Sequence, residues 1–466
     1  MDVKETAAQD QSQAQAQAQA QDQAHEEAAR ARALAHVEAA KARAAEIPGL
    51  AADARPRPVN AVAVIGAGTM GGGIAMALAN IGIAVTVIDV NAEALERGLA
   101  RVRDNYAGTV KRGRLTEAQM AERLALIGRA TDMGAAANAD LIVEAVFEDL
   151  GLKQNVFRQI DAVARPGAIL ATNTSGLDID AIAAVTGRPR DVVGAHFFSP
   201  AHVMKLLEVV RARDTADDVI VTLMDLGVRM GKVAVLARIY PGFIGNALFR
   251  NYTREAHFLV EDGALPHEVD AALTRFGYAM GIFAVHDMAG NDVGYQTKKA
   301  LMATRPTDRR WNDLIMKLCD LGRLGQKSGK GWYRYEPGSR TPVRDPELED
   351  FIVAESARMG RARRPISEDE IIRRCVWSMV NEGARLLEAG IALRASDIDI
   401  TYVTGYGFPA FRGGPMYYAD QAGLANVLAD IERLHAEYGF WWQPAPLLVK
   451  LARAGKTFAD FDAGRA

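Results

Sequence analysis

The chain has 466 residues, of which 49% are hydrophobic and 24% charged, and its formal net charge is −3. This length is too great for one ordinary domain and predicts about three. The weak net charge argues against nucleic acid or an anionic membrane surface as a partner, and no apolar run approaches the roughly 20 residues that span a bilayer.

Residues 1–57 are expected to form a tail and a linker. Up to about residue 45 they are biased toward Ala, Gln, Glu and Arg, with an alternating Gln-Ala tract at residues 13–20. This composition can form a helix, yet it offers almost no apolar stripe to bury, so a mobile or weakly helical tail is favoured. Pro48, Pro56 and Pro58 then mark a linker.

The compartment is predicted from the cysteines and the two ends of the chain. Cys319 and Cys375 lie far apart and lack metal-ligand spacing, which favours a reducing compartment. The first residues, MDVKETAAQDQ, carry acids and no apolar core, unlike a signal peptide or a typical transit peptide. The last residues, DAGRA, are not a peroxisomal address. We therefore expect the protein in the cytoplasm.

A glycine-rich fingerprint occupies residues 59–90, which read VNAVAVIGAGTMGGGIAMALANIGIAVTVIDV. A buried strand is predicted at residues 62–65 and a helix from Thr69, and Gly66, Gly68 and Gly71 follow the spacing G-x-G-x-x-G across this junction. The first glycine permits the tight turn, the second lets a pyrophosphate approach the backbone, and the third lets helix and strand pack closely. The pyrophosphate would lie at the positive N-terminus of the helix.

A second predicted strand, residues 84–88, ends at Asp89, which lies 18 residues after Gly71. A carboxylate at about this distance accepts hydrogen bonds from an adenosine ribose and repels a 2′-phosphate. The strand, turn, helix, second strand and acid occur in order, which favours dinucleotide binding over a purely structural turn. We therefore predict NAD, rather than NADP, as the cofactor.

Residues 58–240 alternate strands with helices, which predicts an α/β Rossmann-like domain with a parallel sheet and crossover helices. Further strands are predicted at residues 140–144, 168–172, 192–195, 206–210 and 233–236. Pro241 and Gly242 break this pattern, and helices dominate the rest of the chain. An all-α C-terminal region is therefore expected.

The helical region contains an internal repeat. A shift of 127 residues superimposes four residue pairs, and six further inserted residues superimpose two more. These pairs are Glu255 with Glu382, Glu261 with Glu388, Gly263 with Gly390, Asp270 with Asp397, Asp287 with Asp420, and Gly290 with Gly423. Six matches in order indicate duplication of one helical unit. We predict a first unit with a connector at residues 241–345 and a second unit at residues 346–466.

Polar side chains follow the predicted strands at the carboxyl edge of the sheet, where Rossmann-like domains bind ligands. His196 follows one strand and Glu208 lies in the next. Alcohol oxidation by NAD needs a group that takes the hydroxyl proton, and histidine suits this role because its ordinary pKa is about 6.5. A carboxylate would orient the imidazole and stabilise the imidazolium. Taken alone, the two residues fit a structural histidine and a solvated strand-edge acid.

Five longer motifs occur in order: VIGAGTMGGGIA, EAVFEDLGLK, ATNTSGLDI, GAHFFSPAHVMKLLEVV and PGFIGNALF. Together they resemble the L-3-hydroxyacyl-CoA dehydrogenases of fatty-acid β-oxidation, from about residue 59 to the C-terminus. The late segment NEGARLLEAGIALRASDIDITYVTGYGFPAFRGGPMYYAD is similar to the dehydrogenase half of the multifunctional β-oxidation enzymes.

The resemblance implies a role for each matching residue. His196 would be the general acid/base and Glu208 its partner, while Ser175 and Asn246 would contact the substrate oxygen and the nicotinamide region. The positions that match NAD contacts are Gly66, Gly68, Thr69, Met70, Gly71, Asp89, Val146, Phe147, Glu148, Lys153, Ser175 and Ser199. Ser199 stands where many relatives carry Asn beside the nicotinamide ribose.

The implied reaction is hydride transfer from C3 of an (S)-3-hydroxyacyl-CoA to NAD, while His196 removes the hydroxyl proton. Coenzyme A carries several phosphates, so basic side chains should border its site. The candidates are Arg101, Arg103, Lys111, Arg112 and Arg114, for which a solvated helix face is the alternative. Tyr418 resembles a substrate-contacting tyrosine of the multifunctional enzymes, with core packing as the alternative.

Two further expectations concern assembly and activity. Under the 127-residue shift Asn246 falls on Arg373, so the second unit is expected to be structural and the chain to be a pseudo-dimer, as a monomer or weak homodimer. The segment before Val59 is too short for an enoyl-CoA hydratase domain, so no hydratase activity is expected. The alternative functions are a short-chain 3-hydroxybutyryl-CoA dehydrogenase and a non-catalytic NAD-binding scaffold.

Overall fold

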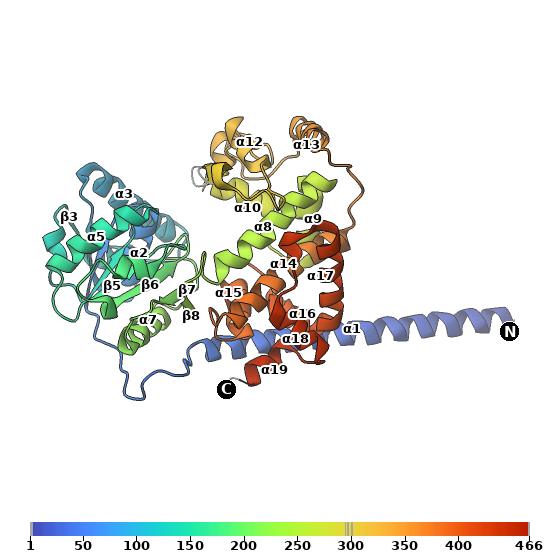
Figure 1. Cartoon of the computed structure of the whole chain (residues 1–466), viewed down its shortest axis with the longest axis horizontal. Helices are drawn as coiled ribbons and strands as arrows, with labels where there is room; N and C mark the ends of the chain where they lie inside the picture. Colours follow the sequence, from blue (N-terminus) through green and yellow to red (C-terminus); the bar gives the residue numbers. More distant parts are fainter. Residues whose placement is uncertain (1–2, 294, 296–297, 300–301, 465–466) are drawn as a thin grey trace.

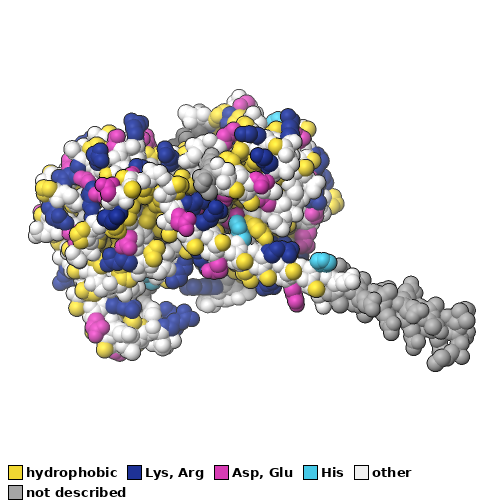
Figure 2. Space-filling view, turned by 90° about the horizontal axis from the view of Figure 1, so that it is seen from below, with side chains coloured by type: hydrophobic (Ala, Val, Ile, Leu, Met, Phe, Trp, Pro, Cys, Tyr) yellow, Lys and Arg dark blue, Asp and Glu magenta, His cyan; other side chains and the backbone are white. Residues whose placement is uncertain are grey.

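A computed structural model describes residues 3–293, 295, 298–299 and 302–464 of the chain. It consists of an α/β body and a helical body, and only the C-terminal part of the long helix α1 (Val3–Ala44) runs along the helical body, while its N-terminal part extends away (Figure 1). No helix of the described part is long and apolar enough to cross a membrane. On the face seen in Figure 2, basic and acidic side chains are interspersed among apolar ones, in keeping with the weak net charge.

The α/β body is built on one eight-stranded sheet with the order β3-β2-β1-β4-β5-β6-β7-β8. The strands are β1 (Ala61–Ile65), β2 (Ala84–Ile88), β3 (Ile127–Ala130), β4 (Leu141–Glu144), β5 (Ile169–Thr172), β6 (Val192–Phe197), β7 (Leu206–Arg211) and β8 (Val233–Arg238). All neighbours pair in parallel except β6 and β7, which are antiparallel. The parallel sheet was therefore predicted correctly apart from this one pair. Strand β3 was not predicted, because only two of its four residues are even partly buried at the sheet edge.

Helices cover both faces of this sheet. They are α2 (Thr69–Ala79), α3 (Ala92–Lys111), α4 (Glu117–Ala125), α5 (Leu150–Val163), α6 (Ile179–Ala183) and α7 (Asp217–Arg229). Alternate residues of a strand point to opposite faces. Val62 and Val64 accordingly pack with α2, α3 and α7, whereas Ala63 and Ile65 pack with α5 and α6. Burial on both faces explains why the strands read as continuous apolar runs.

The helical body confirms the predicted repeat of two helical units. The first unit contains α8 (Gly245–Asp262), α9 (Pro266–Phe276) and α10 (Ile282–Ala289), and the second contains α14 (Glu368–Glu388), α15 (Ala395–Gly405) and α16 (Pro415–Ala422). The other α-helices are α12 (Leu314–Asp320), α13 (Pro346–Arg358), α17 (Leu424–Tyr438), α18 (Pro446–Arg453) and α19 (Phe458–Ala463). Short 3-10 helices are η1 (Met133–Ala136), η2 (Pro189–Asp191), η3 (Met302–Thr304), η4 (Gln326–Ser328), η5 (Ala410–Arg412) and η6 (Phe440–Trp442).

A buried aspartate fixes the third helix of each unit in the same way. In the first unit, Asp270 accepts hydrogen bonds from the backbone N–H groups of Phe283 and Ala284, both at 3.0 Å. In the second unit, the N–H groups that start α16 donate to Asp399. The predicted pairing of Asp270 with Asp397 is therefore wrong by two residues. The reason is that the connection before α15, residues 389–394, is longer than the connection before α9, residues 263–265.

A second aspartate pair follows the predicted register. Asp287 accepts hydrogen bonds from the N–H groups of two consecutive residues, 332 and 333. Asp420 does the same with the N–H groups of residues 458 and 459. Both carboxylates thus anchor a distant chain segment to the end of the third helix. Because the same contacts recur at corresponding positions, a shared composition alone does not explain the match between the two units.

The N-terminal tail is wrongly predicted in one respect, because the end of α1 does bury a stripe. Ala33, Val37, Ala40 and Ala44 lie at helical spacing and are all buried, with α1 packed on α15. His36 Nε2 lies 2.9 Å from Asp399 Oδ2. The stripe was not predicted because three of its four members are alanines, which are only weakly hydrophobic and do not stand out in an alanine-rich segment.

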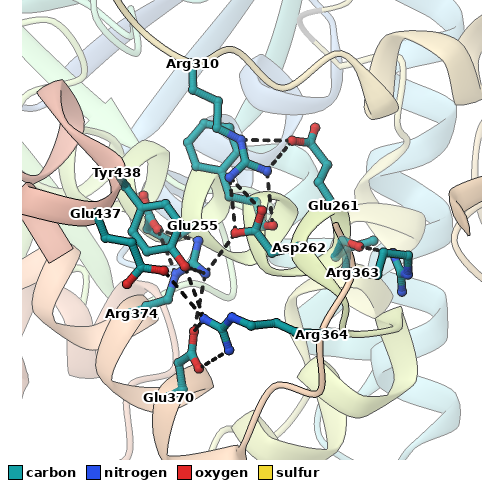
Figure 3. Close-up of polar contacts among 12 residues, drawn as sticks. Glu255, Glu261, Asp262, Arg310, Arg363, Arg364, Glu370, Arg374, Glu437 and Tyr438 are labelled. Carbon is teal, nitrogen blue, oxygen red and sulfur yellow. Dashed lines mark hydrogen bonds and ion pairs between the residues drawn. The ribbon is translucent and has the colours of Figure 1, made fainter. Parts of the chain in front are cut away.

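An ionic network joins the two helical units (Figure 3). Its centre is the buried Arg374 of α14, which donates to Glu255 at 3.3 Å and to Asp262 at 3.0 Å, both on α8. Arg310 also contacts Asp262, through an ion pair of 2.8 Å, and pairs with Glu261. The helices α8 and α14 therefore meet through paired charges as well as apolar side chains.

Candidate active site

The predicted catalytic pair lies at the antiparallel edge of the sheet. His196 on β6 is directly opposite Glu208 on β7, and opposite residues of an antiparallel pair present their side chains on the same face. His196 Nδ1 lies 2.7 Å from Glu208 Oε2, and both side chains are buried. The strand register therefore explains why two residues that are twelve positions apart form one pair.

The carboxylate of Glu208 also holds the start of α8. Its Oε1 accepts hydrogen bonds from the backbone N–H groups of Ile244 at 3.2 Å and Gly245 at 2.9 Å. These groups are unpaired donors at a helix N-terminus, where a negative charge is favourable. The turn before α8 is strained, since the buried Phe243 has φ of 50°, a conformation that costs about 1–3 kcal/mol in a bulky residue. The two bodies therefore meet at the carboxylate of Glu208.

This arrangement selects one tautomer of the histidine. An ionised carboxylate can only accept, so His196 Nδ1 carries a proton and donates to Glu208, which leaves Nε2 free to accept. The imidazole is held by aromatic rings, with that of Phe198 at 4.3 Å and that of Phe243 at 5.8 Å between centroids. The site thus presents an imidazole held in one orientation, with a carboxylate placed to stabilise its charged form.

The glycine loop fits a dinucleotide pyrophosphate. Gly66 has φ of 105°, and a Cβ on Gly71 would lie 1.8 Å from the Gly66 oxygen, so no side chain fits where helix and strand cross. A Cβ on Gly68 would meet nothing within 4 Å, and Thr69 beside it is exposed, so the backbone here is open to a ligand. No side chain caps the start of α2, which leaves its first N–H groups available to phosphate.

Asp89 lies beside this loop, as predicted. Its Oδ2 accepts a hydrogen bond from the Ala67 N–H at 3.0 Å, and its Oδ1 accepts one from the Asn91 N–H at 3.0 Å. These contacts fix the carboxylate at the end of β2 and leave it partly exposed. Met70 is also partly exposed on the first turn of α2. The loop, the helix start and the acid therefore form one continuous surface for NAD.

A buried lysine orders the loop after β4. Lys153 is paired with the buried Glu144 at 2.7 Å and with Glu148 at 3.4 Å. Glu144 also accepts a hydrogen bond from the Val146 N–H at 2.7 Å. Burial raises the pKa of Glu148, but the hydrogen bond from Thr174 and the charge of Lys153 outweigh this effect and lower it overall. The loop is thereby held with Phe147 pointing into solvent, at 87% exposure.

The loop after β5 brings Ser175 to the same edge. Glu148 Oε1 accepts hydrogen bonds from the Ser175 N–H at 2.7 Å and from its hydroxyl at 2.9 Å. The Asn246 side chain on α8 donates to the Ser175 carbonyl at 3.4 Å. A Cβ on Gly176 would lie 2.7 Å from the Gly242 nitrogen, so this loop touches the turn before α8. Ser175 and Asn246 are thus brought together at the joint between the bodies.

Three predicted residues are not brought to this centre by any described contact. Arg112 follows the last residue of α3 and donates to Thr109, and the 20 residues of that helix place it about 30 Å from the Asp89 end. Tyr418 packs against Trp377 and Phe276 among the helices. Ser199 is exposed on the connection between β6 and β7.

Several residues of this centre were not predicted. Glu144 ends an apolar strand, and an acid in that position was the signal that could have singled it out. Thr172 donates to Glu144 at 2.7 Å. Tyr406 from α15 donates to the Asn246 side chain at 2.7 Å, and nothing in the local sequence indicates this contact.

A Rossmann-like domain with an open glycine loop and a buried His–Glu pair at its edge defines the class of NAD-dependent dehydrogenases. The family model for the 3-hydroxyacyl-CoA dehydrogenase NAD binding domain matches residues 61–239. The model for the 3-hydroxyacyl-CoA dehydrogenase C-terminal domain matches twice, at residues 242–335 and 371–460. The chain belongs to the 3-hydroxyacyl-CoA dehydrogenase family, which confirms the resemblance noted in the sequence and the choice of NAD.

Known proteins share long stretches of this chain. The peroxisomal bifunctional enzyme of Danio rerio is 42% identical over 417 residues, which cover 86% of this chain and 57% of that protein. The chain thus spans little more than half the length of that relative. The crystal structure of 3-hydroxybutyryl-CoA dehydrogenase from Escherichia coli K12 has a TM-score of 0.74 and 30% identity, covering 86% of this chain and 99% of that one. The dehydrogenase part of multifunctional enzyme 1 from C. elegans has a TM-score of 0.67 and 29% identity, covering 89% and 96%.

Proposed function

We propose that the chain oxidises (S)-3-hydroxyacyl-CoA to 3-ketoacyl-CoA with NAD. The observation that carries this proposal is the His196–Glu208 pair at 2.7 Å, set beside Ser175 and Asn246 at the joint of the two bodies. A scaffold that only binds NAD has no need of a buried carboxylate pointed at an imidazole. Family membership and the fit of the glycine loop support the same reaction.

In the proposed mechanism, His196 Nε2 accepts the proton of the substrate 3-hydroxyl. Glu208 stabilises the imidazolium that forms, because it already accepts the hydrogen bond from Nδ1. The two N–H groups at the start of α8 hold this carboxylate in place throughout. NAD, when bound along the glycine loop, supplies the hydride acceptor. Asn246 and Ser175 orient the substrate oxygen through their amide and hydroxyl groups.

The acyl-CoA substrate has room along α8. One helical turn after Asn246, Phe249 and Arg250 line a cavity of about 840 Å³, a volume in the range that holds drug-sized ligands, roughly 300–1,000 Å³. Arg250 contacts only a backbone carbonyl among the hydrogen bonds and ion pairs of the described residues. It can therefore meet an anionic group of the substrate.

Steady-state NADH formation from (S)-3-hydroxyacyl-CoA of several chain lengths tests this function. His196→Gln should lower kcat by roughly a hundredfold or more, because it removes the general base. His202→Gln, a substitution on the loop that follows, is the matched control and should keep kcat within about twofold. Normal turnover by a folded His196→Gln variant would show that the proton goes elsewhere.

We also propose that the protein acts as a monomer with an internal pseudo-dimer. The support is the contact between α8 and α14 through Arg374 (Figure 3), since the second unit here covers the face of the first. Light scattering of the intact chain should give the mass of one chain. An obligate dimer that separates α8 from α14 would contradict this assembly.

We propose the cytoplasm as the compartment. The support is that Cys319 and Cys375 are both free thiols, in keeping with a reducing environment. The name of the Danio rerio relative places that protein in peroxisomes. Cell fractionation with antibody detection separates the two, and recovery of the chain in the peroxisomal fraction would contradict the cytoplasmic proposal.

A further inference from the structure

The second helical unit sends one side chain into the active site of the first. Tyr406 follows the last residue of α15, and its hydroxyl lies 2.7 Å from Asn246 Oδ1 on α8. These residues are 160 positions apart in the chain. The approach requires a glycine at position 245, because a Cβ there would lie 2.4 Å from the Tyr406 ring.

The Ser175 carbonyl sets which way the Asn246 amide faces, and the Tyr406 hydroxyl holds it in that orientation. The Ser175 carbonyl can only accept, so the amide group that faces it at 3.4 Å is Nδ2. The amide oxygen then faces Tyr406, which must donate. In this orientation the second N–H of Nδ2 is left for a substrate oxygen. In the opposite orientation the amide would present a lone pair to that oxygen and to the Ser175 carbonyl.

Aromatic packing keeps the tyrosine in position. Its ring stacks on that of Tyr402 at 4.8 Å and packs against Phe198 at 5.6 Å and Phe249 at 5.5 Å. Phe198 is the residue that also packs on the His196 imidazole. Burial, followed by the nearby charge of Glu208, raises the pKa of Tyr406 well above its usual range. The phenol therefore stays protonated and can donate at any ordinary pH.

We propose that Tyr406 is a positioning residue of the dehydrogenase, through which the second helical unit completes the active site of the first. It fixes the Asn246 amide so that its N–H, and not its oxygen, meets the 3-oxygen of the substrate. This inference rests on the proposed function. It also gives the second unit, which has Arg373 in place of the amide, an indirect part in turnover, through Asn246.

The test is a double-mutant cycle between Tyr406→Phe and Asn246→Ala, measured as NADH formation from (S)-3-hydroxybutyryl-CoA. Tyr406→Phe keeps the ring and its packing but removes the donor. It should lower kcat by roughly 5–30-fold with little change in the KM for NAD. In the Asn246→Ala background the same change should alter kcat by less than about twofold, because Tyr406 acts through the amide.

Tyr402→Phe is the matched control. Its hydroxyl donates to the Gly245 carbonyl at 3.2 Å, a backbone contact, so its removal should lower the Tm and leave kcat within about twofold. An active wild type with an unimpaired Tyr406→Phe variant would overturn the inference alone, as would equal losses in both backgrounds. A wild type that forms no NADH would overturn the proposed function and the inference with it.

Discussion

The two helical units share a scaffold but differ at the start of their first long helix. Both hold their third helix with a buried aspartate, Asp270 in one and Asp399 in the other. In the first unit α8 begins at Glu208 of the proposed catalytic pair, which accepts its N-terminal N–H groups. In the second unit α14 is capped by its own Ser367, which accepts from the Glu370 N–H at 3.1 Å. The two units thus share the contacts that hold their third helix, and only α8 begins at the proposed catalytic pair.

The side chains at corresponding positions of the two helices, Asn246 and Arg373, also differ in their surroundings. Asn246 faces Ser175 at the joint of the bodies. Arg373 pairs with Asp369 at 2.9 Å and with Asp430 at 3.1 Å and is 45% exposed. Exposed ion pairs contribute little to stability. Among the described residues, the ion pairs of Arg373 involve only Asp369 and Asp430, so no contact gives it a role like that of Asn246.

The largest effect is expected where the units meet. Arg374→Met should lower the free energy of unfolding by about 3–5 kcal/mol, because it removes one of the two arginines that pair with each of the buried Glu255 and Asp262. Arg364 of the same network (Figure 3) has a side chain that is 43% exposed, so Arg364→Met should cost less than about 1 kcal/mol. Urea unfolding followed by circular dichroism measures both. Equal costs for the two variants would mean that burial does not govern this network.

At Asp397 we expect the opposite outcome, a substitution that raises stability, and its size should depend on pH. This side chain is buried, its Oδ1 has no hydrogen-bond partner among the described residues, and the Arg394 guanidinium lies 3.5 Å away. Burial raises its pKa from 3.8 to about 7. Between these values the folded chain holds a proton that the unfolded chain has released, so this group lowers stability as the pH rises.

Asp397→Asn removes this loss of folding stability, because an amide side chain does not titrate. The variant should therefore gain up to about 4 kcal/mol above pH 7 and nothing below about pH 4, as measured by urea unfolding across this range. The exposed Asp53→Asn variant is the control and should follow the wild-type curve. A gain that is independent of pH would show that the carboxyl does not titrate as its burial requires.

The sequence indicated the fold and the catalytic pair because their signals are local. Continuous apolar runs mark the buried strands, and the spacing of the glycines marks the cofactor loop. His196 was singled out after one apolar strand and Glu208 within the next, but their roles came from the resemblance to the 3-hydroxyacyl-CoA dehydrogenases rather than from the strands. The repeat was detected from six residue pairs, although its register failed at Asp397 because the preceding connection differs in length between the units.

The remaining features depend on tertiary placement. The N–H groups of Ile244 and Gly245 become ligands of Glu208 only once α8 meets β7. Tyr406 reaches Asn246 only through the packing of α15 on α8, and no periodicity encodes that contact. The burial of the end of α1 rests mostly on alanines, which carry little apolar signal in a sequence that is rich in them.

We propose that the first unit, and not the second, supplies the amide that contacts the reacting oxygen. The most direct test is to measure kcat for NADH formation in Asn246→Ala and Arg373→Ala side by side. Asn246→Ala should lower kcat by roughly a hundredfold, since it removes a donor aimed at the reacting oxygen. Arg373→Ala should keep kcat within about twofold. A normal kcat for Asn246→Ala, or equal losses in the two variants, would contradict the conclusion that only the first unit carries the chemistry.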